Sequence, residues 1–119
     1  MNEIKLKRAY EPAAPEDGYR VLVDRIWPRG VSKAKASVHE WPKEAAPSNE
    51  LRKWFHAHRS QWDEFKRRYR SELDAHRQTL ESLAARLDDE PVTLVYSSRN
   101  TEQNNAVVLK EYLEELAAG

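Results

Sequence analysis

The sequence contains no cysteine, only three glycines and no long apolar run. The missing cysteines exclude disulfides, thiolate nucleophiles and cysteine-ligated zinc or iron-sulfur centres. A glycine-rich phosphate loop and a G-x-S-x-G nucleophile turn are also absent. No stretch approaches the ~20 apolar residues of a membrane span, and residues 1–8 lack the apolar core of a signal peptide. We therefore expect a cytoplasmic protein with no membrane segment, no metal and no cofactor.

Charge of one sign is not in excess either, because 20 basic residues balance 20 acidic ones. The whole-molecule field therefore gives no argument for nucleic acid, a membrane surface or a strongly acidic partner. A chain of 119 residues is long enough for one domain, which buries about two-thirds of the surface that its unfolded form exposes. We expect a single domain over residues 1–119, and its oligomeric state stays open.

Two apolar runs, at residues 21–23 and 92–96, are typical of strands buried on both faces. Both end in polar turns, which predicts that they are parallel neighbours. Residues 3–10 alternate apolar Ile4 and Leu6 with basic side chains, a pattern that predicts a half-buried strand near a sheet edge. The predicted class is α/β, with a small, mostly parallel central sheet flanked by helices as in a Rossmann-like three-layer sandwich.

Helical patterns fill most of the chain between the strands. Ser32 is a predicted cap for one or two turns, and Ser48 for a helix through residues 51–55. Ser60, with Asp63 three residues later, resembles a capping box at the start of an apolar stripe that runs to Leu87. We expect a break near residues 75–78, although one continuous helix or a coiled-coil pairing is also compatible with the stripe. A last helix is expected over residues 102–117.

The best candidate site lies at two junctions between a strand and a helix, residues 24–30 and 97–105. Ligands of open α/β sheets bind at the carboxyl ends of the strands, where both junctions should lie if the strands are parallel. Arginines and the free N–H groups of a helix start favour a phosphate or carboxylate. The candidate residues are Asp24, Arg25, Trp27 and Arg29 from the first junction and Ser97, Ser98, Arg99, Asn104 and Asn105 from the second.

The leading hypothesis is a small anion-binding protein, and an enzyme acting on an anionic metabolite is its catalytic version. Asp24 would be a base or an orienting group, while Arg25 and Arg99, with Arg29, would hold charge. A carboxylate beside two arginines is kept in its charged, weakly basic form, which favours binding over base catalysis. The structural alternative is that Asp24 pairs with Arg25 or caps neighbouring backbone while the asparagines only complete the helix start. Trp27 would then belong to an aromatic core.

A second hypothesis is a nucleic-acid or protein interaction module built on residues 51–70. This region holds seven basic residues against two acidic ones, a local charge of roughly +5 that an ordinary solvated helix face would also explain. His56 and His58 flank Ala57, but no cysteine or clustered carboxylate accompanies them, so solvated histidines are favoured over a metal site. No base-reading motif is present, and we expect no specific reading of DNA.

Several segments together resemble the YeaO-like family of small bacterial proteins. They are Lys7-Arg8-Ala9-Tyr10, the run from Gly18 to Gly30, the run from Ala46 to Phe55, Phe65-Lys66-Arg67-Arg68-Tyr69 and Asn105-Ala106-Val107-Val108-Leu109. The resemblance spans nearly the whole chain and implies a compact α/β sandwich around a mostly parallel sheet, with no assigned activity. Some relatives carry a methyltransferase label, which nothing in these residues supports. A sister branch has a Cys-His-Arg motif at the start of its last helix, where this chain has Asn104, Asn105 and Ala106, so any chemistry of that motif does not carry over.

Overall fold

Three parallel strands form the centre of the computed structural model, which describes every residue from Met1 to Gly119. They are β1 (Ile4–Arg8), β2 (Tyr19–Leu22) and β3 (Val92–Tyr96), in the order β1-β3-β2. Leu94 of β3 lies opposite Leu6 on one side and Val21 on the other. The predicted parallel pairing of the two apolar runs is confirmed, and β3 is buried along its whole length. All three strands therefore end at the same edge of the sheet.

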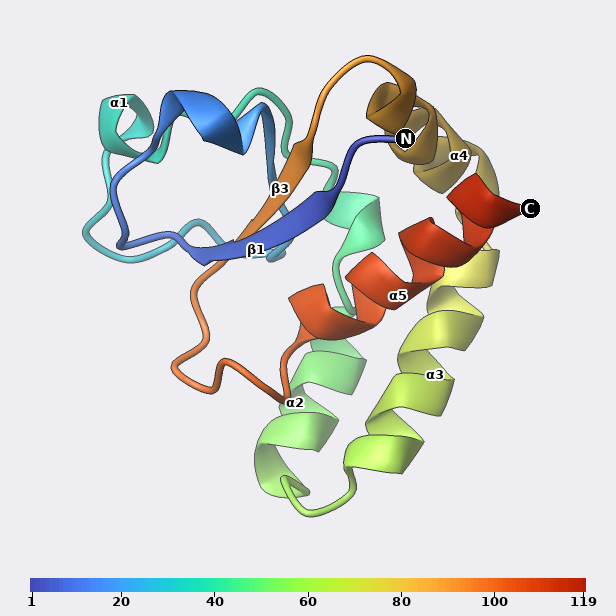
Figure 1. Cartoon of the computed structure of the whole chain (residues 1–119). Helices are drawn as coiled ribbons and strands as arrows, with labels where there is room; N and C mark the ends of the chain where they lie inside the picture. The colour runs from blue at the N-terminus through green and yellow to red at the C-terminus, as the bar shows by residue number, and fades with distance from the viewer.

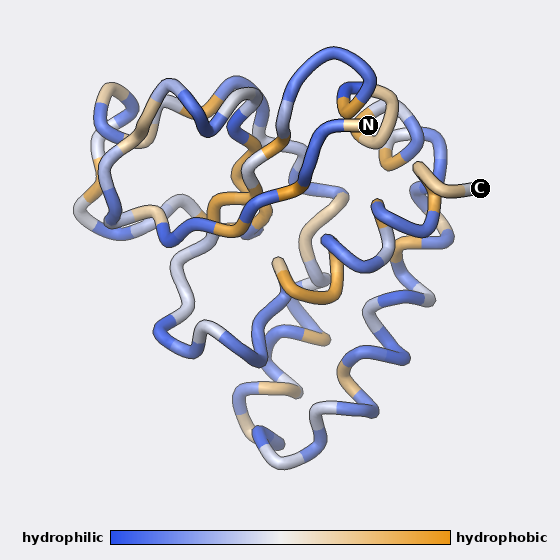
Figure 2. Tube along the Cα trace, viewed as in Figure 1, coloured by the Kyte–Doolittle hydropathy of each residue, from blue (hydrophilic) through white to orange (hydrophobic).

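One face of the sheet carries the main hydrophobic core. Alternate strand residues such as Ile4, Val21 and Leu94 pack against buried side chains of α3 (Trp62–Asp74), α4 (Arg77–Ala85) and α5 (Asn105–Ala118), including Tyr69 and Leu109. Figure 1 shows these helices on one side of the sheet, with α5 lying alongside β1, and Figure 2 shows the apolar residues concentrated on the strands and the first turns of α5. The α/β class predicted from the sequence is confirmed.

The opposite face is covered by a largely irregular segment. Its regular parts are only the short helix α1 (Lys33–Ala36) and a 3₁₀ turn, η2 (Lys43–Ala45). Three tightly buried residues, Ala9, Leu22 and Val95, form a small second core with Trp27 and the partly buried Val38 and Trp41. Prolines 28, 42 and 47 interrupt this segment, because a proline lacks the N–H that a continuing helix or strand requires. The third layer is thus built mainly of loop rather than helix.

A buried ion pair completes the second face of the sheet. Asp17 ends the 3₁₀ turn η1 (Pro15–Asp17), and one of its carboxylate oxygens lies 2.6 Å from a guanidinium nitrogen of Arg20. Arg20 also donates two hydrogen bonds to the carbonyl of Ala36, and Lys7 reaches the same carboxylate at 3.1 Å. The hydroxyl of Thr93 donates to the backbone carbonyl of Asp17. These contacts fasten the loop after β1 and the segment after β2 to the sheet.

Four helices connect or follow the strands: α2 (Asn49–Ala57), α3 (Trp62–Asp74), α4 (Arg77–Ala85) and α5 (Asn105–Ala118). The hydroxyls of Ser32 and Ser48 cap their helices as predicted, and the predicted break near residues 75–78 is confirmed. Between α4 and β3 lies one further 3₁₀ turn, η3 (Arg86–Asp88).

Two helix starts were predicted wrongly. Gln61, not Ser60, precedes α3, because the N–H of Gln61 bonds the carbonyl of His58 and prolongs the turn after α2. The last helix begins at Asn105 rather than at residue 102. The side-chain oxygen of Asn100 accepts hydrogen bonds from the N–H groups of Glu102 and Gln103, and such local bonds compete with helix formation.

Gly18 provides the first test of the fold. Its φ is +66°, and an added Cβ would lie 2.2 Å from the carbonyl oxygen of Pro91, so backbone must move to admit alanine. We expect Gly18→Ala to lower the free energy of unfolding by about 2 kcal/mol or more, measured by urea denaturation. Gly30 is the matched control, because its φ is +79° but nothing lies within 4 Å of the added atom. An equal loss in both variants would show that steric contact at Gly18 is unimportant.

Candidate functional site

A cavity of about 690 Å³ opens at the edge where the strands end. All nine residues predicted from the sequence line it: Asp24, Arg25, Trp27, Arg29, Ser97, Ser98, Arg99, Asn104 and Asn105. The two junctions meet there because β2 and β3 are parallel neighbours. Their ends are tied further by the hydrogen bond from the N–H of Val23 to the carbonyl of Val95. The composite site inferred from the pairing of the strands therefore forms as one cavity.

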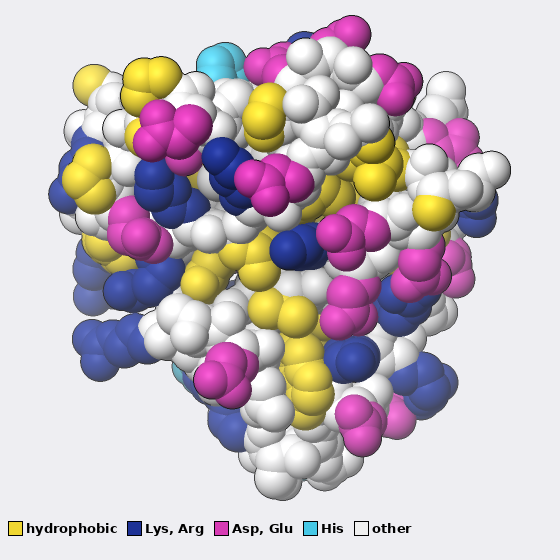
Figure 3. Space-filling model, viewed as in Figure 1, with side chains coloured by type: hydrophobic (Ala, Val, Ile, Leu, Met, Phe, Trp, Pro, Cys, Tyr) yellow, Lys and Arg dark blue, Asp and Glu magenta, His cyan; other side chains and the backbone are white.

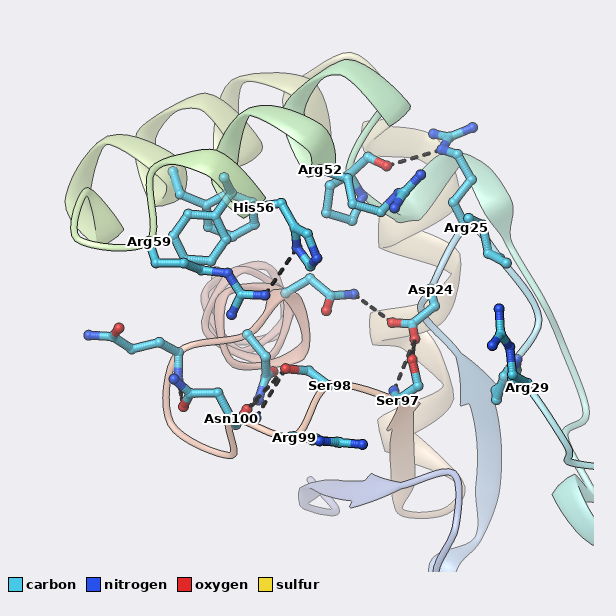
Figure 4. A pocket seen from close by; sticks show the side chains of 18 of the residues that line it. Asp24, Arg25, Arg29, Arg52, His56, Arg59, Ser97, Ser98, Arg99 and Asn100 are labelled. Atoms are coloured by element: carbon cyan, nitrogen blue, oxygen red, sulfur yellow. Dashed lines mark hydrogen bonds between the residues drawn. The ribbon is translucent and has the colours of Figure 1, made fainter.

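Asp24 lines the cavity, and neutral donors hold its carboxylate. One carboxylate oxygen accepts hydrogen bonds from the N–H of Ser97, at 2.9 Å, and from its hydroxyl, at 2.6 Å. The other oxygen accepts from the side-chain amide of Asn105 at 3.1 Å. The alternative in which Asp24 pairs with Arg25 is not observed, since no arginine lies within ion-pair distance of its carboxylate. The charge of Asp24 thus has no cationic partner in the protein (Figure 4).

The loop between β3 and α5 is shaped by bonds to backbone groups. Arg8, at the end of β1, donates to the carbonyls of Ser97 and Ser98. Asn104 caps α5 by accepting from the N–H of Val107, and Asn105 donates to the carbonyl of Val23. Both asparagines therefore serve the fold, as the structural alternative predicted. The same bonds hold the first turn of α5 against the cavity, where the free N–H groups of a helix start favour an anion.

Arg25 and Trp27 also have structural contacts. The guanidinium of Arg25 donates to the carbonyls of Pro47, at 3.0 Å, and Ala46, at 3.3 Å. Trp27 donates to the carbonyl of Val31 and packs edge-on against Trp41. The pocket and core interpretations of Trp27 are therefore both correct, because one indole borders the cavity and belongs to the small second core.

Tyr69 holds the chain segment to which Arg25 is bonded. Its buried hydroxyl donates to the carbonyl of Ala45, next to the carbonyls that receive Arg25. Burial, and then the nearby carboxylates of Asp24 and Glu72, raise the pKa of Tyr69 well above its ordinary value. The phenol therefore stays protonated and remains a donor at physiological pH.

Helix α2 and the turn after it supply three charged or polar cavity residues that the site prediction missed: Arg52 and His56 lie in α2, and Arg59 follows the end of the helix at Ala57. The spacing of four between Arg52 and His56 places both on one helix face, which was the available sequence signal. Arg59 and the ring nitrogen Nδ1 of His56 are 3.0 Å apart. The Nε of Arg52 is buried and has no hydrogen-bond partner in the protein, an unusual state for a group that carries charge.

The arginines that line the cavity differ from most other arginines of the chain because they have no carboxylate partner. Of the chain's twelve arginines, six form ion pairs with carboxylates at other places in the fold: Arg20, Arg67, Arg68, Arg70, Arg77 and Arg86. Arg8 is bound to backbone carbonyls. The remaining five, Arg25, Arg29, Arg52, Arg59 and Arg99, all line the cavity, and none has a carboxylate partner. Five of the six arginines that have no carboxylate partner therefore line one cavity, although Arg25 among them is bound to backbone carbonyls as Arg8 is.

The two halves of the basic region 51–70 have different surroundings in the structure. In its α3 part the three arginines are paired with carboxylates, because Arg67 and Arg68 both bind Glu64 and Arg70 binds Glu115. The hydrogen bonds from Arg67 and Arg68 lower the pKa of Glu64 to about 2, so Glu64 stays charged at physiological pH. Its α2 part turns Arg52 and Arg59 into the cavity. In Figure 3, acidic and basic side chains are intermixed over α3 and α5, and basic ones gather toward the left edge, near the β3–α5 loop.

None of the helices combines the length and the apolar character needed to cross a bilayer. No group of three or more histidine, aspartate or glutamate side chains is arranged to hold a metal ion. His56 faces the arginine-lined cavity, while His58 stacks on Trp54 and bonds its carbonyl.

Comparison with known proteins supports the resemblance seen in the sequence. A family model described as "Inactive DUF488-N3 subclade" matches residues 3–118. "Uncharacterized protein YeaO" of Escherichia coli (strain K12) is 47% identical over 113 residues, which cover 95% of this chain and 98% of that protein. "Uncharacterized protein Rv3073c" of Mycobacterium tuberculosis is 42% identical over 112 residues, covering 92% of each chain. No solved structure matches significantly.

Proposed function

Because this chain belongs to the family described as the inactive DUF488-N3 subclade, we propose that it is a binding protein for a small phosphate- or carboxylate-bearing ligand, which occupies the arginine-lined cavity. The observation that supports the proposal is the gathering of five arginines without a carboxylate partner in one cavity. A guanidinium can bind a phosphate or carboxylate through two parallel N–H groups, and such charge-assisted bonds are among the strongest in proteins. Like charges held together repel unless an anion lies between them.

Binding is favoured over catalysis by the state of Asp24. Three of the roughly four acceptor positions of a carboxylate are taken by Ser97 and Asn105. A general base needs a free lone pair within reach of the proton that it removes. Asp24 keeps one free acceptor position, and its other three hydrogen bonds join the two junctions, so its main role in this arrangement is to orient them. The description of the family as inactive is consistent with a binding role.

The proposal predicts saturable binding of inorganic phosphate to the wild-type protein. At a phosphate concentration of about 100 times Kd, binding to the native state alone adds about 2.7 kcal/mol to the free energy of unfolding, which raises Tm by several degrees. Melting curves should be recorded at millimolar phosphate with ionic strength held constant by chloride, because high phosphate stabilises proteins generally. A Tm that does not respond in this range, together with no heat of binding by calorimetry, would overturn the proposal.

A further inference from the structure

The arrangement of charge within the cavity indicates what kind of anion fits it. This inference rests on the proposed function and goes beyond it, to the chemical class of the ligand. Figure 4 shows Asp24 with Arg29 to its right and Arg59 to its left. Arg25 and Arg52 lie above Asp24 in this view, and Arg99 lies below it. The five arginines therefore lie on different sides of Asp24 and do not converge on one point.

A single oxyanion is too small to contact all five arginines of the cavity. A water molecule occupies about 30 Å³ of liquid, and one phosphate group is only a few times larger, whereas the cavity measures about 690 Å³. Arg52 lies within α2, whereas Arg59 lies two residues beyond the end of the helix at Ala57, and the five residues from Arg52 to that end alone span about 8 Å. An anion placed at the centre would also meet the uncompensated carboxylate of Asp24.

The carboxylate of Asp24 limits which ligand group can lie next to it. Its two oxygens accept three hydrogen bonds, two at one oxygen from Ser97 and one at the other from Asn105. One acceptor position therefore remains for a ligand. Only a donor suits it, because an anion would be repelled and an apolar group would leave the carboxylate without its last partner. A hydroxyl group meets this requirement.

We infer that the ligand is a small molecule with two phosphate or carboxylate groups, held apart by a neutral spacer that carries hydroxyl groups. One anionic group binds on the side of Arg25, Arg29 and Arg52. The other binds on the side of Arg59 and Arg99. A hydroxyl of the spacer donates to Asp24.

Matched sugar phosphates test this inference by isothermal titration calorimetry at physiological ionic strength. Fructose 1,6-bisphosphate and fructose 6-phosphate share their spacer and differ in the second phosphate. The bisphosphate should bind at least about tenfold more tightly, since a charge-assisted hydrogen bond contributes about 1.5–3 kcal/mol. Hexane-1,6-diol bisphosphate, which lacks hydroxyl groups on its spacer, should bind severalfold more weakly than fructose 1,6-bisphosphate. Equal affinity of these two bisphosphates would overturn the role assigned to the hydroxyl.

Two variants separate the sides of the cavity. Arg29→Gln with Arg52→Gln removes charge from one side, and Arg59→Gln with Arg99→Gln removes it from the other. Each should reduce the affinity for fructose 1,6-bisphosphate at least about tenfold, and at least one should leave fructose 6-phosphate within about twofold of wild type. Arg67→Gln with Arg77→Gln is the control, because it removes the same charge from ion pairs outside the cavity.

The outcomes distinguish this inference from the proposed function. If the monophosphate binds as tightly as the bisphosphate, and both pairs of substitutions weaken the two sugars equally, the cavity has one anion site, and only the inference fails. If neither sugar nor inorganic phosphate binds to the wild-type protein, the proposed function fails with it. Tighter binding of a single-stranded oligonucleotide than of either sugar would replace the small ligand with a nucleic acid.

Discussion

A variant with Arg29, Arg52, Arg59 and Arg99 all replaced by Gln should fold normally and lose phosphate binding. Each removed guanidinium takes away charge-assisted bonds of about 1.5–3 kcal/mol, so affinity should fall by at least about 100-fold. Stability in the absence of phosphate should hold or rise, because the substitutions relieve repulsion between groups that have no carboxylate partner in the protein. Calorimetry measures the binding, and urea denaturation in chloride buffer measures the stability.

Arg25 is left in place because its bonds to the carbonyls of Ala46 and Pro47 belong to the fold. The matched control replaces Arg67, Arg68, Arg77 and Arg86 by Gln, which gives the same change in net charge outside the cavity. If binding depends only on the overall field, both variants should weaken it equally. A large loss of stability in the cavity variant alone would mean that these arginines serve the fold.

The largest effect on stability is expected from Arg20→Met. The side chains of Arg20 and Asp17 are only 3% and 5% exposed, so the substitution leaves a buried carboxylate with Lys7 and the N–H of Ala14 as its remaining partners. Removing one member of a buried pair typically costs about 3–5 kcal/mol, a large part of the stability of a small domain. Urea denaturation measures the change in the free energy of unfolding.

Arg77→Met is the control for this substitution. Arg77 and Glu81 form an exposed ion pair on α4, with side chains 62% and 56% exposed, and such pairs contribute about 0–1 kcal/mol. The double variant with Asp17→Leu and Arg20→Met should recover part of the loss, since it removes the uncompensated charge. A cost below about 1 kcal/mol for Arg20→Met would show that the pair is not important for the fold.

The same pair predicts a pH dependence. Burial alone would raise the pKa of Asp17, but hydrogen bonds from the N–H of Ala14 and from Lys7 and Arg20 outweigh it, so the pKa is lowered. The native state therefore binds this proton less readily than the unfolded chain, in which the pKa is about 3.9. The stabilisation from Asp17 is present above about pH 4 and is lost as the pH falls through the lower native value. Asp17→Asn should show a smaller loss of stability on acidification, measured by urea denaturation from pH 7 to pH 2.

The location of the candidate site could be predicted from the sequence because it depends on where two strands end. Two apolar runs that stop at polar turns predicted parallel neighbours, and parallel neighbours bring residues 24–30 and 97–105 to one sheet edge. The roles of individual residues were less accessible. Arg25 and Asn104 have the composition of a binding site, yet both also bind backbone groups, and only the path of the folded chain shows which carbonyls and N–H groups are within reach.

Residues 51–70 show why charge along a sequence misleads. The sequence predicted a basic surface there, but Glu115 on α5 lies next to Arg70, and Glu64 lies one turn from both Arg67 and Arg68. Three of the arginines are neutralised by these contacts. Arg52 and Arg59 instead face a cavity whose other walls come from distant segments. Which cations remain unpaired is a property of three-dimensional proximity.

The sequence by itself determined the α/β class, the three strands, most helix caps and the edge of the sheet where a site should lie, because periodicity, capping and proline act within a few residues along the chain. The tertiary structure alone decided that Asp24 is held by Ser97 and Asn105, that Asp17 and Arg20 form a buried pair beneath Ala36, and that five arginines without carboxylate partners share one cavity. These features depend on distances of a few ångströms between residues far apart in sequence. Hydrogen bonds and ion pairs require that proximity, and it exists only after the segments have packed.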